Sequence, residues 1–549
     1  MAKANPIVGE LLRSQLLALV EDMGQVLSRN AVSSEIVEER DYANGIVLDG
    51  GEVVVVDNLL HLGPVSQSAA VMQDLFQFAL KPGDVILSND PYSGGSHVQD
   101  FTVLTPFHHE REQLCCLVCR AHLPDIGGQV PGGYFPFADD VWAEGSRIPP
   151  LKIVQEGKLV SDKLDAVLIN SRRPDVFRIN LEAMLAALEA GRQRLEQTIV
   201  KYGQQHLRAG IHHCLQASES QLRAEMAEWP MGEYQGRSIL DHDARGGSDL
   251  EIRACLRVGK KVVLDLSGSA PQSSGFVNST RTNTLSYALV PFYALLGGAV
   301  AANSGLLRAL EIVTAEGTIV HPRFPAPVGW GPFHVGAEIV SAVAQALGKM
   351  FPERIAVLAP KFVMLLARWP QRGLSFPLHT FLQGGAAAAS EVDGWGIPGP
   401  FSRGTAPSVE MVESRVPLLI RQLELLPDSA GAGRRRGGFG TLAEFHFREA
   451  GILDAVLEGQ AHSSEPLAAG RPGVASGAEL EGSGPIMGMV WEQQVSGALT
   501  VRMGGGAGWG DPGEREEALI RQDLENELLS ADHVSETYPT HLTLSPRED

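Results

Sequence analysis

The chain has 549 residues, of which 44% are hydrophobic and 20% are charged, and its formal net charge is −20. This composition is typical of a globular protein with enough apolar material for more than one domain. The negative charge argues against a nucleic-acid-binding or membrane-binding protein, because phosphate groups would be repelled. The five cysteines form no disulfide framework, so we expect a reducing, cytoplasmic compartment.

The N-terminal segment is predicted to be an amphipathic helix. Leu12, Leu16, Leu19, Met23 and Leu27 recur at helical spacing, whereas charged residues interrupt the apolar run that a signal peptide would need. No stretch of about 18 uncharged apolar residues occurs in the sequence, so we expect no membrane-spanning segment.

The next 130 or so residues predict strands and one helix. Residues 44–58 have the pattern of a hairpin around Asp-Gly-Gly, and 66–80 that of a helix. Strands are expected at 101–106 and 114–119. The second contains Cys116 and Cys119, whose C-x-x-C spacing we interpret as part of a buried strand rather than a redox or zinc pair.

The rest of the chain mixes both kinds of element. Residues 174–229 predict an antiparallel pair of helices broken near Gly203 or Gly210, and strands return at 250–267, followed by a helix at about 283–301. Residues 303–530 are rich in glycine and proline with short strands, and the tail after Asp511 predicts an acidic helix or helix pair.

We therefore predict an α+β fold with a mixed, multi-domain architecture, because strands and helices do not alternate steadily. The expected parts are a metal-binding α/β region at 1–173, a helical segment at 174–235, a mixed and glycine-rich region at 236–513, and the acidic helical tail at 514–549.

Two His-x-x-Asp elements stand out, His97 with Asp100 and His122 with Asp125. Imidazole nitrogen together with carboxylate oxygen suits Zn²⁺, Mn²⁺ or Fe²⁺ better than Ca²⁺. Ligands on loops that enter or leave strands can converge on one point, and a metal there would activate water and polarise a carbonyl. His61, His108 and His109 are nearby alternatives, and spacing alone leaves a purely structural role open.

Nine segments, in order from about residue 5 to residue 515, resemble the hydantoinase B / 5-oxoprolinase family, which includes acetone-type carboxylase large subunits. They are "ERDYANGIVLDG", "LSNDPYSGGSHVQDFTVLTPF", "CRAHLPDIGGQVPGG", "EGSRIPPLKI", "NSRRPDVFRINLEAMLAALEAGRQRL", "DLSGSAPQSSGFVNST", "AEGTIVHPRFPAPV", "LLPDSAGAGRRRGGFG" and "GGGAGWGDPGER". The sequence around Asp41 departs from the usual family pattern, which leaves the substrate open.

The resemblance implies the metal-binding, B-type subunit of an ATP-dependent cyclic amidohydrolase in a hetero-oligomer. A partner A-type subunit would bind ATP and phosphorylate the carbonyl oxygen of a hydantoin, 5-oxoproline or another small lactam. The absence of a G-x-x-x-x-G-K-[ST] sequence agrees with ATP being handled by another chain. The alternatives are an acetone-type carboxylase large subunit and a non-catalytic partner of an A-type subunit.

The resemblance also implies roles for particular residues. The family's metal ligands correspond to Asp41, His97, Asp100 and His122, and Asp125 is a candidate fifth ligand, positioning group or proton acceptor. Arg120 and Arg147, beside the metal-binding loops, are candidate binders of a phosphate or a substrate carboxylate.

Overall fold

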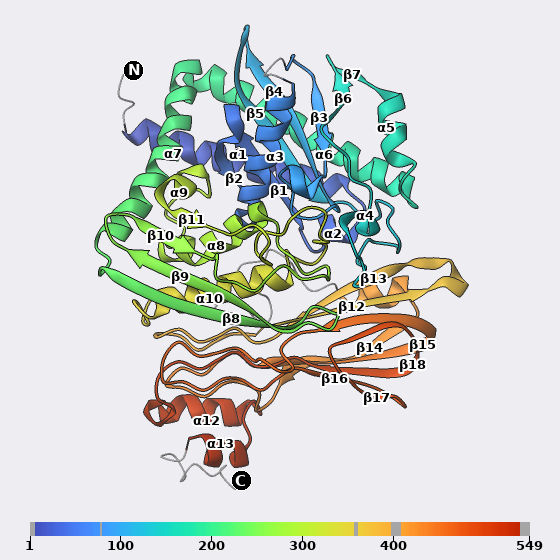
Figure 1. Cartoon of the computed structure of the whole chain (residues 1–549), viewed down its shortest axis with the longest axis vertical. Helices are drawn as coiled ribbons and strands as arrows, with labels where there is room; N and C mark the ends of the chain where they lie inside the picture. The colour runs from blue at the N-terminus through green and yellow to red at the C-terminus, as the bar shows by residue number, and fades with distance from the viewer. Residues whose placement is uncertain (1–5, 77–79, 356–360, 397–407, 539–549) are drawn as a thin grey trace. The chain divides into compact units, whose positions relative to one another are not determined.

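The computed structural model describes residues 6–76, 80–355, 361–396 and 408–538. The chain divides into two compact units, each built from two segments. Unit 1 comprises Met1–Glu233 and Leu256–Gly336, and unit 2 comprises Tyr234–Cys255 and Ala337–Asp549. Both contain helices and sheets (Figure 1), so the fold class is α+β, as predicted. The four parts expected from the sequence were defined by residue pattern, whereas these two units are defined by spatial compactness. The four-part division therefore stays a prediction.

A seven-stranded antiparallel sheet lies at the centre of unit 1, with the strand order β2-β1-β5-β4-β3-β6-β7. The hairpin and the two strands expected in this region are confirmed, and the strands at 101–106 and 114–119 are longer than predicted. The bounds are β1 Tyr42–Val47, β2 Val53–Val56, β3 Val85–Ser88, β4 Asp100–His109, β5 Glu112–His122, β6 Leu151–Gln155 and β7 Lys158–Leu159.

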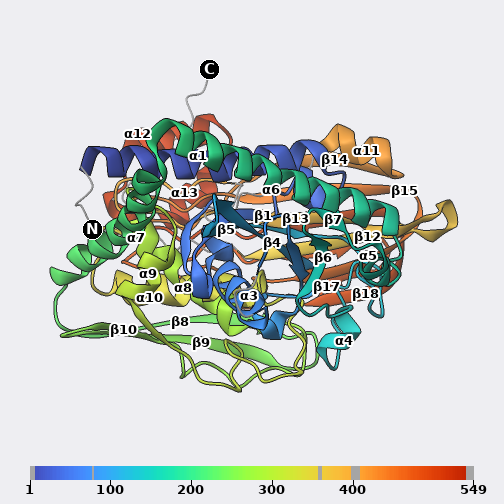
Figure 2. The ribbon, with the colours of Figure 1, turned by 90° about the horizontal axis from the view of Figure 1, so that it is seen from above.

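Helices cover both faces of this sheet. α1 (Pro6–Asn30) and α6 (Pro174–Tyr202) pack on one face, and α3 (Leu62–Leu75) packs on the other (Figure 2). The five apolar residues that predicted the first helix are each at most 3% exposed. Because both faces are covered, β1 and β2 are apolar at nearly every position and show little alternation. The last part of the helix expected at 66–80 falls on 77–79, outside the described residues.

The predicted break in the helical segment is at Gly203. α6 ends at Tyr202 and α7 (Gln204–Ala227) begins after this glycine, whose φ of 85° is accessible to glycine at little cost. α6 packs mainly on α1, whereas α7 packs on both α1 and α9 (Ser304–Ala309). The two helices contact each other much less, so they do not form the expected antiparallel pair.

α8 (Arg281–Leu295) is shorter than the helix expected at 283–301. Gly297 and Gly298, with φ of 57° and 74°, follow its end and take the chain out of the helical conformation. The remaining elements of unit 1 are α2 Ser34–Val37, α4 Val141–Glu144, α5 Ser161–Leu168, α9 Ser304–Ala309, β10 Val262–Asp265 and β11 Glu311–Val313, and the last two pair in parallel.

Unit 2 is built on a second seven-stranded sheet, with the order β13-β12-β15-β18-β16-β17 and β14 pairing with β15. Two of its strands are long rather than short, because β15 (Gly440–Leu457) and β18 (Met489–Arg502) pair along most of their length. The other strands are β12 Phe362–Trp369, β13 Leu374–Gln383, β14 Leu418–Leu426, β16 Gly477–Leu480 and β17 Gly484–Ile486.

The other elements of unit 2 include the predicted pair of C-terminal helices, α12 (Glu517–Glu525) and α13 (Ala531–Thr537). The unit also contains α11 (Val409–Arg415). β8 (Gly232–His242), β9 (Ser248–Val258) and α10 (His334–Gly348) lie mostly within it. None of the helices in the described part of the chain combines the length and the apolar character that crossing a bilayer requires.

Candidate metal centre

The candidate site lies at one edge of the unit 1 sheet, where β1 and β4 begin and β5 ends. Asp100, the first residue of β4, is the register partner of His122, the last residue of β5. Asp41 directly precedes β1, and its carbonyl accepts the backbone N–H of His122 at 3.1 Å. The antiparallel pairing therefore brings three residues from distant parts of the chain to one edge.

His97 reaches the same edge from the loop before β4. The side chain of Asn89 holds this loop by donating to the carbonyl oxygens of Val98, at 2.6 Å, and Ser146, at 2.8 Å. His97 is 1% exposed. The loop is thus fixed from within, and the imidazole is placed before any ligand binds.

His97, Asp100 and His122 form a close triangle. The distance from His97 Nε2 to His122 Nδ1 is 3.2 Å, and Asp100 Oδ1 lies 3.3 Å from the former and 3.5 Å from the latter. Ligand atoms at tetrahedral angles and about 2.05 Å from a metal ion lie about 3.4 Å from each other. The triangle therefore has the dimensions of one face of a first-row metal site.

The donor chemistry also fits a cation. Asp100 Oδ1, the oxygen that belongs to the triangle, is buried and has no hydrogen-bond donor in the described part of the chain. Two imidazole nitrogens and one carboxylate oxygen are a ligand set for Zn²⁺, Mn²⁺ or Fe²⁺. A buried carboxylate oxygen without a partner is costly, and a bound cation would relieve that cost.

Asp41 and His61 extend the triangle. Asp41 Oδ2 is 3.5 Å from His122 Nδ1, and Asp41 Oδ1 is 3.4 Å from His61 Nε2. The Asp41 side chain is 23% exposed, whereas those of Asp100 and His122 are each 2% exposed. The cluster is therefore accessible on the Asp41 side. Of the alternative histidines, His61 joins the cluster, while His108 is eight residues along β4 from Asp100, about 26 Å away.

Arg120 holds Asp100 and is not placed to bind substrate. Its side chain has no exposed surface, and its guanidinium donates to Asp100 Oδ2 at 2.9 Å, to Ser96 Oγ at 2.7 Å and to Thr102 Oγ1 at 2.7 Å. Ser96 Oγ also donates to Asp100 Oδ2, at 2.8 Å. One carboxylate oxygen is thus fixed by two donors, and the other is turned toward the triangle. The substrate-binding role expected for Arg120 has no support in this geometry.

Arg147 and Asp125 are also engaged with other residues. Arg147 makes a two-pronged ion pair with Asp90, at 3.0 and 2.9 Å. The fully buried Asp125 carboxylate accepts the backbone N–H of Arg172 and, at 2.8 Å, its guanidinium. These contacts anchor loops near the cluster. Neither the Arg147 guanidinium nor the Asp125 carboxylate is therefore free to bind substrate or to accept a proton, as the sequence had suggested.

Tyr134 was not predicted from the sequence. Its hydroxyl is 3.5 Å from His122 Nε2, and the two rings are parallel within 9°, with centroids 6.0 Å apart. Since Nδ1 of His122 faces the triangle, Tyr134 contacts the opposite nitrogen and orients the ring. Tyr134 follows His122 by twelve residues in an irregular loop, so no periodicity marks it.

The charges of the cluster shift its titrations strongly. Burial lowers the pKa of His97. Burial also opposes protonation of His122, but the nearby carboxylates of Asp100 and Asp41 raise its pKa to about 9. Burial would raise the pKa of Asp100, yet the positive charges of His97 and Arg120 hold it well below its usual range. The cluster thus stabilises positive charge at its centre.

The sequence profile of the hydantoinase B/oxoprolinase family matches residues 5–512, so the chain belongs to this family of B-type subunits of ATP-dependent enzymes. The caprolactamase beta chain of Pseudomonas jessenii is 29% identical over 97% of this chain and 95% of the relative. The B-type chain of a putative D-/L-hydantoinase from a Pseudomonas species is 24% identical over the whole chain and 97% of the relative. 5-Oxoprolinase of Dictyostelium discoideum is longer, and the chain covers 35% of it at 26% identity.

Two solved structures share the fold. The ATP-dependent caprolactamase of Pseudomonas jessenii superposes with a TM-score of 0.85 at 26% identity, covering all of this chain and 98% of that one. A nucleotide-free acetone carboxylase superposes with a TM-score of 0.84 at 17% identity, covering 97% of this chain and 79% of that one. The second likeness shows the fold alone.

Proposed function

We propose that the protein is the metal-binding, B-type subunit of a cytoplasmic, ATP-dependent cyclic amidohydrolase. An A-type subunit would bind ATP and phosphorylate the carbonyl oxygen of a hydantoin, 5-oxoproline or similar lactam, and this chain would complete hydrolysis of the C–N bond. The observation that carries the proposal is the triangle of His97, Asp100 and His122, with edges of 3.2–3.5 Å, in a chain of this family.

The proposed metal ligands are His97, Asp100 and His122, with Asp41 as a fourth. A divalent cation held there supplies Lewis-acid polarisation of a carbonyl and of water. Asp41, the most exposed of the four, is where substrate and water approach. Arg120 and Tyr134 hold the ligand side chains of Asp100 and His122 in place, so little reorganisation is needed when the cation binds.

His61 is the better placed proton acceptor in this cluster. Its Nε2 lies 3.4 Å from Asp41 Oδ1, so a proton that it takes from water would be stabilised by that carboxylate. Asp125 was the acceptor expected from the sequence, but its carboxylate is occupied by Arg172. We therefore assign Asp125 to fixing the loop after β5 and His61 to proton transfer.

The acetone-type carboxylase is the second candidate. The chain covers 98% of the caprolactamase chain but 79% of the acetone carboxylase chain, although both superpose equally well. The caprolactamase also has the higher identity. These differences favour hydrolysis of a cyclic amide over carboxylation.

The direct test is to co-express this chain with a candidate A-type subunit and to assay ring opening of 5-oxoproline, hydantoins and simple lactams with and without ATP. We expect opening of at least one of these rings, dependent on ATP and on both chains. Ring opening by this chain alone without ATP, or bicarbonate-dependent consumption of a ketone by the complex, would contradict the proposal.

A second experiment addresses the metal. His122→Ala should lower the metal content of the purified protein and abolish turnover, while the two subunits still co-purify. His108→Ala, at the distant end of β4, is the matched control and should keep both metal and activity. Retention of more than about a tenth of wild-type activity by His122→Ala would remove His122 from the ligand set, because changes around a ligand alone cost about 10–100-fold.

A further inference from the structure

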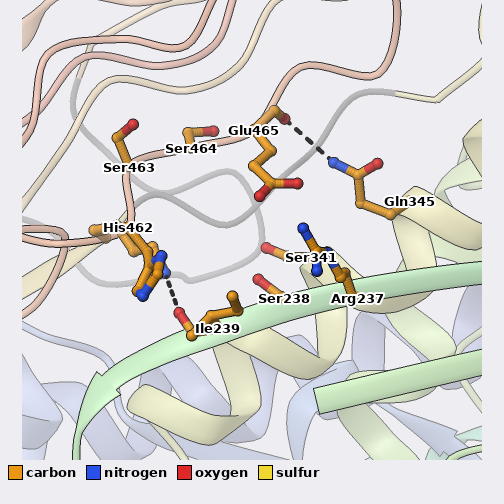
Figure 3. Close-up of a pocket in the computed structure, with 10 residues that line it drawn as sticks. Arg237, Ser238, Ile239, Ser341, Gln345, His462, Ser463, Ser464 and Glu465 are labelled. Atoms are coloured by element: carbon orange, nitrogen blue, oxygen red, sulfur yellow. Dashed lines mark hydrogen bonds between the residues drawn. The ribbon is translucent and has the colours of Figure 1, made fainter. Parts of the chain in front are cut away.

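Unit 2 contains a polar pocket that the proposed chemistry does not use. It is formed by β8, by one face of α10 and by the loop at 462–465 (Figure 3), and its empty space of about 360 Å³ includes solvent at the open side of the pocket. Its polar lining includes Arg237, Ser341, Gln345, Lys361, Ser464 and Glu465. All of these residues belong to unit 2.

The frame of this pocket is fixed. The Asp241 carboxylate accepts the backbone N–H groups of Gln460, Ala461 and His462, at 2.8, 3.1 and 3.1 Å, and so anchors the start of the loop. Gln345 Nε2 donates to the carbonyl of Glu465 at 3.3 Å and anchors its end. A loop held at both ends presents its side chains without a large entropic cost on binding.

The floor of the pocket is a buried ion pair. Lys361 Nζ donates to Glu338 Oε1 at 2.7 Å and to the carbonyl of Ile239 at 2.9 Å. An ammonium group has three donors, so one N–H of Lys361 is left for the pocket that this residue lines. Glu338 balances the charge of Lys361, and Glu458 and Asp241 add negative charge beside it, so the floor offers a donor without a net positive charge.

Several groups in the pocket have no partner within the described part of the chain. The hydroxyls of Ser341 and Ser464 make no hydrogen bond there, although these residues are only 6% and 8% exposed. The guanidinium of Arg237 and the carboxylate of Glu465 are also without ion pairs among the described residues. In Figure 3 both charged groups point toward the hydroxyls of Ser238 and Ser341 in the middle of the pocket.

We propose that this pocket binds a small amino acid as its zwitterion. Arg237 and the hydroxyls of Ser341 and Ser464 would donate to the carboxylate of the ligand, and Glu465 would accept from its ammonium group. An anion such as phosphate would meet Arg237 but would be repelled by Glu465, and a simple amine would leave Arg237 without a partner. A ligand that carries both charges offers partners to Arg237, to the two serine hydroxyls and to Glu465.

Direct pairing of Arg237 with Glu465 is the competing arrangement. A pair of exposed side chains contributes little stability, so a ligand that offers both charges can displace it. Hydrolysis of a lactam releases an amino acid, and a link between this pocket and product release would rest on the proposed function. Amino-acid binding itself does not rest on the proposed function, because neither ATP nor a second chain takes part in it.

Ligand-observed NMR on the purified full chain tests the proposal, with glycine, 4-aminobutanoate and 6-aminohexanoate as amino acids and acetate, propylamine and phosphate as single-charge probes. We expect at least one amino acid to bind with a Kd on the order of 0.1–1 mM, as suits so small a ligand. Arg237→Gln and Glu465→Gln should each weaken it at least tenfold, whereas Arg253→Gln and Glu479→Gln, which lie outside the pocket, should not.

The proposal is overturned if acetate or phosphate binds as tightly as the amino acids, if Glu465→Gln leaves affinity unchanged, or if no amino acid binds at about 10 mM. His122→Ala separates this result from the function of unit 1. Loss of ring opening with amino-acid binding retained supports both assignments, and binding in a protein with no ring-opening activity would contradict only the proposed function.

Discussion

Replacing Arg120 by methionine tests whether this arginine fixes the carboxylate that the proposed metal site needs. Arg120 has no exposed surface, Asp100 is 2% exposed, and Nη2 of the arginine lies 2.9 Å from Oδ2 of the aspartate. Removal of one member of a buried ion pair costs about 3–5 kcal/mol, because the remaining charge is left buried without a partner. Methionine fills part of the same volume, so the cost of a cavity is small beside the electrostatic cost.

The expected result has two parts. In the presence of a chelator, Arg120→Met should lower the free energy of unfolding by about 3 kcal/mol, at the lower end of that range because Asp100 can be relieved by taking up a proton. Its affinity for Zn²⁺ or Mn²⁺ should fall by about 10–100-fold, since Asp100 Oδ1 is no longer held toward His97 and His122. Urea unfolding measures the first quantity, and competition with a metal-sensitive dye measures the second.

Arg147→Met is the matched control. Arg147 also forms an ion pair, with Asp90, but its side chain is 20% exposed and Asp90 lies outside the triangle. This variant should keep the metal affinity of the wild type. If Arg120→Met binds metal as tightly as Arg147→Met, or loses less than about 1 kcal/mol of stability, Arg120 does not position Asp100, and the reasoning fails.

Three other predictions concern different parts of the chain. Burial raises the pKa of Glu144 to about 8 despite hydrogen bonds from Val328 and Gly329, so the folded protein keeps a proton that the unfolded chain releases above about 4.5. The free energy of unfolding should therefore fall as pH rises from about 4.5 to about 8. Urea unfolding at pH 5 and pH 8 should show a smaller change for Glu144→Gln than for the wild type, and equal changes would refute this assignment. In unit 2, a Cβ at Gly506 would lie 1.9 Å from the carbonyl oxygen of Ala386, whereas one at Gly477 would meet nothing within 4 Å. Gly506→Ala should lower thermal stability by about 1–3 kcal/mol or more and Gly477→Ala should not, and equal melting temperatures would contradict this packing. Burial raises the pKa of the Cys115, Cys116 and Cys119 thiols, and Cys255 is the most exposed of the five cysteines. Iodoacetamide should therefore modify Cys255 first in the native protein, as mass spectrometry of peptides can show, and early labelling of Cys119 would be the contrary result.

The part of the candidate metal centre that sequence reasoning found follows from strand geometry. His97 with Asp100 and His122 with Asp125 stood out because each pair lies where a strand begins or ends, and the β4–β5 pairing then makes Asp100 and His122 register partners. The same alternation explains why Cys116 and Cys119 are not a functional pair, since side chains three residues apart on one strand point to opposite faces. Asp41 carries no such signal and entered only through the family resemblance.

The roles of Arg120, Arg147 and Asp125 could not be read from the sequence, because each depends on a partner that is distant in the chain. Asp125 is neutralised by Arg172, 47 residues later, and Arg147 by Asp90, 57 residues earlier. Arg120 is an inward-facing residue of β5, and its partners Ser96, Asp100 and Thr102 come from β4 and the loop before it. A charged residue beside a candidate site is free for substrate only if no such partner exists.

The charge balance of the cluster explains why an arginine would lie beside a proposed metal ligand. Asp41 and Asp100 contribute two negative charges and Arg120 one positive charge, while His97 and His122 face each other across 3.2 Å. Without Arg120, two carboxylates would face the same buried centre, and their mutual repulsion would favour protonation over an open metal face. With Arg120, one oxygen of Asp100 is neutralised on the side away from the triangle and the other keeps its lone pairs for the cation. The guanidinium therefore makes it possible to bury the proposed carboxylate ligand while its second oxygen stays accessible to a dication.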